Sequence, residues 1–102
     1  MAAKRRKIAA SWWLYIARCA DGTLYTGVAR DVAARIAQHD AGKGARYTRG
    51  RGPLCVVLRG RCKTQGEALR LELRVKALPR EEKEALIARP RRLSALRRGD
   101  PV

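Results

Sequence analysis

Five side chains that can take part in cleaving a phosphodiester bond occur in order along the chain. Tyr15 and Tyr25 lie ten residues apart, Arg35 and His39 follow, and Glu72 comes much later. A phenol or an imidazole can position a water molecule or accept its proton, a guanidinium can bind phosphate, and a carboxylate can hold a metal ion. The set therefore makes hydrolysis of a phosphate ester a candidate chemistry.

A β-hairpin is predicted to position the two tyrosines. Residues 12–19 are rich in aromatic and β-branched side chains, Asp21-Gly22 is a turn signal, and residues 24–28 form the return strand. Side chains on a strand alternate between its two faces, so the length of the loop decides which residues share a face. The loop thus decides whether the two phenols can act together.

A three-residue loop, Ala20-Asp21-Gly22, brings both phenols to one face. It pairs Tyr15 with Gly27 and Tyr25 with Ala17, whereas a two-residue loop sends the phenols to opposite faces. A glycine at the third position suits the left-handed conformation of such loops, so we favour the three-residue loop. The small neighbours of the phenols would leave room for a ligand. Four apolar side chains then fill the opposite, core-facing side: Leu14, Ile16, Leu24 and Val28.

The first predicted helix runs from Val32 to about Asp40, with Asp31 as its N-cap and Gly42 after its end. Residues four apart share a side of a helix, so Arg35 and His39 lie together. The other side carries Val32, Ala33, Ile36 and Ala37. A solvated face is the alternative interpretation of both polar residues. His39 is the single histidine, and its imidazole could exchange a proton near neutral pH.

The second predicted helix begins at the Thr64–Glu67 capping box and runs to about Leu78. Glu72 falls near the middle of an apolar arc made of Ala68, Leu69, Leu71, Leu73, Val75 and Leu78. A carboxylate facing a core is costly unless it finds a cation. Glu72 is therefore either a salt-bridge partner or a metal ligand, and a single carboxylate suits Mg²⁺.

The complete order of elements is β-β-α-β-α-α. Residues 54–58 are a short apolar run that predicts a buried strand, and Arg80 to Ala88 form a third helix after Pro79. We expect an α+β fold, a small three-stranded antiparallel sheet flanked by helices. A flexible basic arm (residues 1–10) precedes the domain (residues 11–88), and a disordered basic tail (residues 89–102) follows it.

A glycine-rich basic loop spans residues 42–53 and could bind nucleic acid. Its basic side chains can contact phosphates and its tyrosine can stack on a base. The residues concerned are Lys43, Arg46, Tyr47, Arg49 and Arg51. The loop lacks the ending of a P-loop, and a flexible solvated loop is the alternative interpretation.

Charge and composition favour a nucleic-acid partner. The 102 residues include 24 Lys and Arg against 9 Asp and Glu, which gives a formal net charge of +15. A positive charge of this size favours a polyanionic binding partner. No apolar stretch is long enough for a membrane span, and no export signal is present. The three cysteines lack the spacing of a disulfide framework or zinc site. We expect reduced thiols in a cytoplasmic protein without a small-molecule substrate, in an oligomeric state that the sequence leaves open.

With these residues the chain resembles the GIY-YIG nuclease domain, and especially the small stand-alone bacterial proteins that consist of little else. Trp13-Leu14-Tyr15 stands for the first signature and Tyr25-Thr26-Gly27 for the second. Arg35 matches the helix arginine of the family, Glu72 its metal-binding glutamate, and His39 a tyrosine or histidine position. The segment 42–47 also looks typical of the stand-alone subgroup. The likeness covers about residues 12–88, although the chain lacks the asparagine that many members carry.

The resemblance implies a GIY-YIG fold and a metal-dependent endonuclease, with DNA favoured over RNA and a structure-selective role in DNA repair or processing. Mg²⁺ or Mn²⁺ would bind Glu72, and Arg35 would bind the phosphate. Tyr15 would act as general base, which requires a lowered phenol pKa. Tyr25 or His39 would relay the proton, or one of them would be the base instead. The alternative function is a non-catalytic nucleic-acid-binding module that uses the same basic surface.

Overall fold

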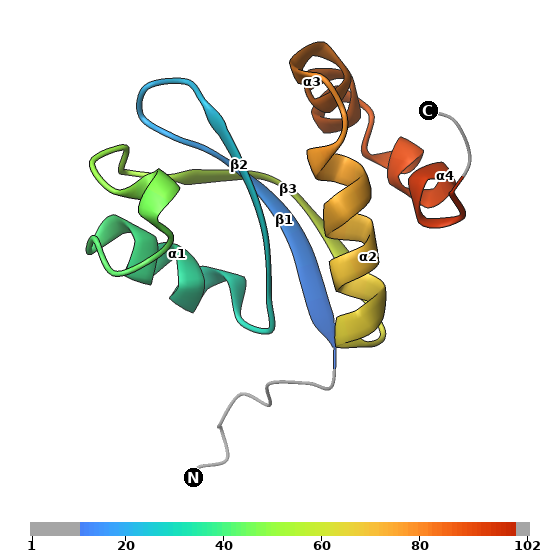
Figure 1. The fold of residues 1–102 in the computed structure, drawn as a ribbon, viewed down its shortest axis with the longest axis horizontal. Coiled ribbons are helices and arrows are strands. Elements are labelled where there is room, and N and C mark those ends of the chain that lie inside the picture. Colours follow the sequence, from blue (N-terminus) through green and yellow to red (C-terminus); the bar gives the residue numbers. More distant parts are fainter. Residues whose placement is uncertain (1–10, 100–102) are drawn as a thin grey trace, which may run out of the picture.

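Three antiparallel strands form the centre of the computed structural model, which describes residues 11–99 (Figure 1). β1 (Trp12–Arg18) lies between β2 (Leu24–Ala29) and β3 (Cys55–Cys62), so β2 and β3 are the edges of the sheet. The predicted three-stranded antiparallel sheet is confirmed. The predicted basic arm, residues 1–10, lies outside the described residues.

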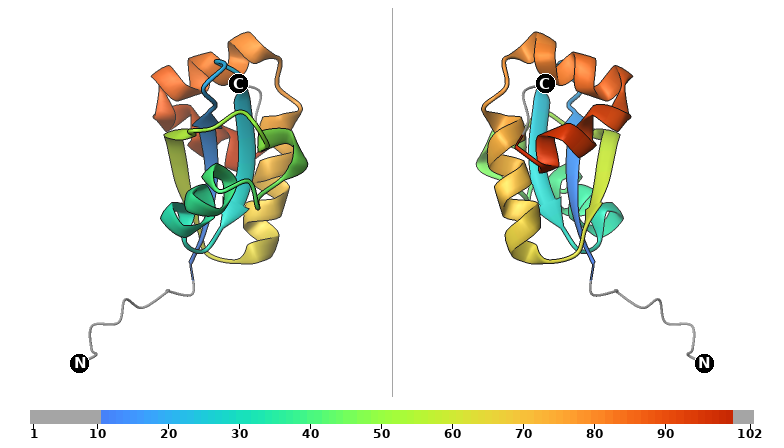
Figure 2. Two further views of the ribbon diagram at one scale, coloured as in Figure 1. Left: turned by 90° about the vertical axis from the view of Figure 1, so that its left-hand side faces the viewer. Right: turned by 90° about the vertical axis from the view of Figure 1, so that its right-hand side faces the viewer.

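Helices cover both faces of this sheet (Figures 1 and 2). On one face lie α1 and a short 3-10 helix, η2; on the other lie α2, α3 and α4, the last after a 3-10 turn, η3. Their bounds are α1 Val32–Asp40, η2 Arg46–Thr48, α2 Gln65–Lys76, α3 Arg80–Ala88, η3 Pro90–Arg92 and α4 Leu93–Arg97. Among residues 11–99, no helix is long and apolar enough to cross a membrane.

The hairpin has the predicted three-residue loop. The Cys19 N–H donates to the Thr23 carbonyl at 2.8 Å, and Gly22 adopts a left-handed φ of 88°. As a result, Tyr15 pairs with Gly27, and both tyrosines of the hairpin point to the same face. The register was predictable because it depends only on a local turn and on the alternation of side chains.

Each face of the sheet has its own core. Leu14 and Ile16 are fully buried on the core-facing side, as predicted, and they pack with residues of α2, α3 and also α4. The opposite face is also covered, because α1 and the loop after it pack over Tyr15, whose side chain is fully buried. The expectation that small neighbours leave room for a ligand beside this phenol is therefore wrong for Tyr15, since its hydroxyl already fills the space next to Gly27.

Residues 89–99, which follow α3, are ordered, in contrast to the disorder predicted from their arginine-rich composition. Leu93 and Leu96 of α4 are buried in the core of the α2 face. Gly60 of β3 makes this contact possible, because a Cβ at that position would overlap the Leu93 side chain. The prediction of a disordered tail from residue 89 is wrong, because this arginine-rich segment contains a short amphipathic helix with two buried leucines. β3 is also longer than predicted, continuing to Cys62.

An ion pair attaches α3 to the central strand. Both guanidinium nitrogens Nη1 and Nη2 of Arg18 donate to the Glu84 carboxylate at 2.9 Å. The Arg18 hydrogen bonds, with a smaller contribution from Arg80, lower the pKa of Glu84 to about 2. This contact fixes the start of α3, and with it Lys83, near the open edge of β2.

Candidate active site

Four aromatic rings from four elements gather on one face of the hairpin. Tyr25 on β2 lies 5.0 Å from the His39 ring of α1 and 6.3 Å from the Tyr15 ring of β1, measured between centroids. The Tyr47 ring of η2 stacks on Tyr25 at 5.9 Å. The structure therefore brings together three of the five candidate catalytic residues and one residue of the basic loop.

Tyr15 and His39 form a buried hydrogen-bonded pair. The Tyr15 hydroxyl lies 3.0 Å from His39 Nε2, and His39 Nδ1 lies 2.7 Å from Thr48 Oγ1. Thr48 uses its hydroxyl proton to donate to the Ala45 carbonyl at 2.8 Å, so it must accept from His39 Nδ1–H. In the neutral imidazole, Nε2 is then the acceptor, and the Tyr15 hydroxyl donates to it.

Burial moves the pKa values of this pair apart. Desolvation, assisted by the neighbouring Tyr25, raises the pKa of Tyr15 to about 12, against an opposing effect of Arg35. Desolvation and then the positive charge of Arg35 lower the pKa of His39 below 6.5. At neutral pH the phenol therefore keeps its proton and the imidazole is uncharged. His39 is not on a solvated face, since its side chain is 2% exposed.

Arg35 and Glu72 both act on the Tyr15 phenol. After desolvation, which has the largest effect, the positive charge of Arg35 lowers the pKa of this phenol and the negative charge of Glu72 raises it, while the Arg35 guanidinium donates to Gln38 Oε1 at 2.8 Å. Tyr15 and Arg35 belong to the α1 face, whereas Glu72 belongs to α2 on the other face. Tyr25 from the α1 face and Lys76 from α2 meet at the outer edge of β2, where no further strand of the described residues covers the sheet.

A cleft of about 340 Å³ opens along this edge. It is lined from both layers by Leu24, Tyr25, Thr26, Tyr47, Lys76 and Lys83. Lys76 also forms an ion pair with Glu72, with 3.3 Å between Nζ and Oε2. The sequence reasoning missed both cleft lysines. The i,i+4 spacing of Glu72 and Lys76 could have revealed the first, whereas Lys83 carries no local signal.

Glu72 does not lie in the middle of an apolar arc. The buried stripe of α2 is narrower than predicted and consists of Ala68, Leu71 and Val75, while Leu69 and Leu73 are exposed. The Glu72 side chain is 16% exposed and lies at the border of this stripe. On α1, likewise, Ala33 and Ala37 face solvent and His39 faces the sheet. The number of leucines led to an overestimate of the width of the buried face of α2, because only part of the helix surface packs against the sheet.

The basic loop is held in place. Thr48 contacts His39, and the Ala20 N–H donates to the Arg51 carbonyl at 2.7 Å. The exposed side chains of the predicted binding set are Lys43, Arg46, Tyr47 and Arg49. Arg51 differs, because its guanidinium pairs with Asp21 at 2.6 Å and lies over the Tyr47 ring. It anchors the loop to the hairpin, which makes it a weaker candidate for a phosphate contact.

The donor set around Glu72 fits a hard divalent cation. Within residues 11–99 no group of three or more His, Cys, Asp or Glu side chains could enclose a metal. The Glu72 carboxylate pairs with Lys76, which lines the cleft, so a cation already lies beside these oxygens. Mg²⁺ commonly binds one or two carboxylates and completes its shell with water and phosphate. A single glutamate is therefore a sufficient protein anchor for such an ion.

Substitution of Gly27 by alanine is expected to displace the Tyr15 phenol. An added Cβ would lie 2.7 Å from the Tyr15 hydroxyl oxygen and 2.8 Å from its ring carbon Cζ. Overpacking of this kind costs about 1–3 kcal/mol and would break the hydrogen bond to His39. Urea unfolding and the His39 ring signals in NMR spectra measure both effects. Unchanged stability and unchanged His39 signals would contradict the arrangement.

Comparison with known proteins agrees with this architecture. The family described as "GIY-YIG catalytic domain" matches residues 11–85. A UPF0213 protein of Yersinia pestis (strain Pestoides F) is 49% identical over 86 residues, covering 83% of this chain and 90% of that protein. A UPF0213 protein of Cronobacter sakazakii is 49% identical over 77 residues, covering 76% and 81%.

A solved structure is similar as well. The solution NMR structure of a UPF0213 protein from Bacillus halodurans has 46% sequence identity and a TM-score of 0.51, covering 76% of this chain and 83% of that one. The match over residues 11–85 spans the hairpin, α1, β3 and α2 and so contains every candidate catalytic residue. The chain therefore belongs to the GIY-YIG catalytic domain family, a family of nucleases, and resembles its small stand-alone UPF0213 members.

Proposed function

We propose that the protein is a metal-dependent endonuclease that hydrolyses phosphodiester bonds in nucleic acid, with DNA as the favoured substrate. The observation that carries this proposal is the grouping of Tyr25 with the Tyr15–His39 pair beside a cleft that Lys76, the ion-pair partner of Glu72, also lines. The net charge of +15 and the cationic cleft beside this pair suit a polyanionic substrate. The three free cysteines fit the reducing cytoplasm.

In this proposal Glu72 holds the metal ion, which when bound offsets charge on the scissile phosphate and the leaving oxygen. Arg35 binds a non-bridging phosphate oxygen through its planar donors and stabilises the developing charge. Lys83, which lines the cleft, adds a further cation. The lysine of the ion pair, Lys76, moves from Glu72 to the phosphate when the carboxylate is engaged.

Tyr15 relays a proton to His39 rather than acting as a tyrosinate. Its pKa of about 12 makes the ionised phenol scarce at neutral pH. Because the Tyr15 side chain is fully buried, the relay requires that substrate binding admits the attacking water to its oxygen; the water then gives its proton to this oxygen while the phenol proton passes to His39 Nε2. The water oxygen forms its bond to phosphorus as the bond to the leaving oxygen breaks. Desolvation is the main cause of the lowered His39 pKa and the charge of Arg35 adds to it, so phosphate bound to Arg35 offsets this second effect and makes His39 a better base.

This relay predicts a flat dependence of rate on pH between about pH 7 and 9. His39 is already neutral there, because its pKa lies below 6.5, and the phenol keeps its proton up to about pH 12. A tyrosinate base would instead make the rate rise about tenfold per pH unit over the same range. Single-turnover cleavage rates across this interval distinguish the two. A steady rise would contradict the relay.

Replacing Lys76 with methionine is expected to tighten the binding of Mn²⁺ by about two- to fivefold, since a half-exposed ion pair contributes little. The Lys76 ammonium competes with a divalent cation for the Glu72 carboxylate. Calorimetric titration without nucleic acid measures this affinity. The matched control is Lys83→Met, which removes the other cleft lysine and should leave metal affinity unchanged. An equal gain in both variants would point to a general charge effect.

The test of the proposed function is a substrate survey. Purified protein is incubated with single-stranded, nicked and branched DNA, and with RNA, in Mg²⁺ or Mn²⁺. Preferential cleavage of nicked or branched DNA is expected if the protein acts in DNA repair or processing. Cleavage that persists undiminished in Arg35→Ala would rule out this site as its source.

A second candidate function is a non-catalytic nucleic-acid-binding module. One observation favours it: Glu72 is already paired with Lys76, a stable arrangement without metal. This function predicts salt-sensitive binding that is indifferent to divalent metal and to Glu72→Ala. Failure to cleave every substrate of the survey, combined with such binding, would support the module.

A further inference from the structure

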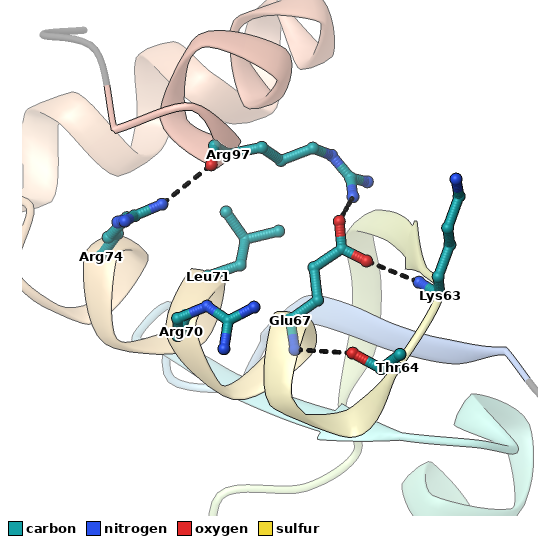
Figure 3. Close-up of a pocket in the computed structure, with 7 residues that line it drawn as sticks. All are labelled: Lys63, Thr64, Glu67, Arg70, Leu71, Arg74 and Arg97. Carbon is teal, nitrogen blue, oxygen red and sulfur yellow. Dashed lines mark hydrogen bonds and ion pairs between the residues drawn. The ribbon is translucent and has the colours of Figure 1, made fainter.

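A second pocket, of about 290 Å³, lies between α2 and α4 (Figure 3). Four cationic side chains, one carboxylate, one hydroxyl and one leucine line it: Lys63, Arg70, Arg74, Arg97, Glu67, Thr64 and Leu71. Four positive charges and one negative charge leave a net charge of +3. Such a pocket attracts an anion, and the proposed hydrolysis uses none of these residues.

The frame of this pocket is fixed by contacts of its own residues. Arg74 Nη1 donates to the Arg97 carbonyl at 2.9 Å and to the Leu96 carbonyl at 3.2 Å, which attaches α4 to α2. The Arg97 guanidinium reaches back over the pocket to Glu67, at 3.8 Å (Figure 3). Glu67 in turn belongs to the N-terminal cap of α2. The pocket is therefore preorganised by contacts within the protein.

Two further cations of the pocket remain available. Among the described residues, no ion pair neutralises Arg70 or Lys63, and both side chains are exposed. Figure 3 shows the Arg70 guanidinium lying beside Glu67, below Leu71. The N-terminal end of α2 contributes additional positive potential. An anion that enters here would meet an uncommitted guanidinium on a rigid support.

The pocket and the cleft lie on opposite flanks of α2. At about 100° per residue, Glu72 falls on the flank that faces the cleft, and Arg70 and Arg74 fall on the other. Leu69 and Leu73, both exposed, form the crest between them. A helix with its side chains is about 10–12 Å thick, so a few nucleotides of a chain crossing the crest would link the two. The apolar crest would contact sugars and bases.

We propose that the pocket between α2 and α4 is a second phosphate-binding site, which takes a backbone phosphate of the nucleic acid whose scissile bond lies in the cleft. This assignment rests on the proposed function for its ligand. A small phosphate compound could bind through the same chemistry. Measurements of nucleic-acid affinity and of inorganic phosphate binding distinguish this ligand from a backbone phosphate. In this proposal the nucleic acid extends from the cleft across α2 to the second pocket.

Arg70→Ala tests the site by nucleic-acid binding without divalent metal, so that its result does not depend on cleavage. Alanine is a good helix residue, and Arg70 is exposed, so the variant should fold. Affinity at about 0.1 M salt should fall about tenfold, the effect of one lost charge-assisted contact. The slope of log affinity against log salt should become shallower by about 0.7–0.9. Arg91→Ala, an exposed arginine outside the pocket, should change neither value.

Titration with inorganic phosphate is the second part of this test. In NMR titrations it should shift the backbone amide signals of Lys63 and Thr64 in the wild type and not in Arg70→Ala. If these shifts occur but nucleic-acid affinity is equal in the two proteins, the pocket serves a small phosphate compound, and the assignment to nucleic acid is overturned. If neither measurement responds to Arg70→Ala, the pocket is not a phosphate site.

Discussion

Replacing Glu72 with glutamine is expected to slow metal-dependent cleavage by about a thousandfold, the scale of losing one main electrostatic contact to the transition state. Glutamine keeps the size of the side chain and removes the charge that would hold the cation. The structural role of Glu72 is small, since its ion pair is with the half-exposed Lys76 one helical turn away. The free energy of unfolding should therefore change by less than about 1 kcal/mol.

Single-turnover cleavage and urea unfolding measure the two quantities on the same preparation. Glu81→Gln is the matched control, because it removes an exposed carboxylate from the first turn of α3. It should leave the cleavage rate within twofold of the wild type. A Glu72→Gln protein that cleaves like the wild type, or that loses activity only because it unfolds, would remove Glu72 from the site.

The second large effect is expected for Tyr15→Phe, which should lower the cleavage rate by about a hundredfold or more. Phenylalanine cannot accept a proton from water or pass one to His39 Nε2, the acceptor in the structure. The change also leaves that buried nitrogen without its donor, which costs about 1–3 kcal/mol of folding stability. Cleavage rates measured well below the unfolding transition separate the catalytic loss from the structural one.

Tyr25→Phe distinguishes the two phenols. Tyr25 contacts His39 and Tyr47 through its ring, which the substitution preserves. We expect a rate within about tenfold of the wild type, because positioning groups contribute less than proton transfer. A larger loss for Tyr25→Phe than for Tyr15→Phe would transfer the general-base role to Tyr25.

Local signals predicted well the hairpin and the helix starts that carry the catalytic candidates. The hairpin register depends on one turn, the cap of α1 on Asp31, and the start of α2 on Thr64 and Glu67, and all three lie where the sequence indicated. Each of these features involves residues within a few positions of one another. The chemistry of Tyr15 was less accessible, since its raised pKa depends on burial by α1 and the following loop, which are remote in sequence.

Contacts between distant segments account for the other differences. The ordering of the arginine-rich C-terminal region depends on Leu93 entering the space above Gly60. The cleft depends on Lys76 and Lys83 meeting the edge of β2 from two helices. Composition cannot reveal such pairings, because an exposed and an anchored lysine or leucine have the same local sequence pattern. Leu73 is the converse case, because the sequence pattern predicted its burial and its side chain is exposed in the structure.

The most direct test of the central claim is single-turnover cleavage of one nicked or branched DNA by four proteins prepared in parallel. These are the wild type, Arg35→Ala, Glu72→Gln and Arg91→Ala, each assayed with Mg²⁺ and with a chelator. The site described here predicts Mg²⁺-dependent cleavage by the wild type and Arg91→Ala, with at least about a hundredfold less by the other two. Equal cleavage by all four proteins, or cleavage that survives the chelator, would contradict it.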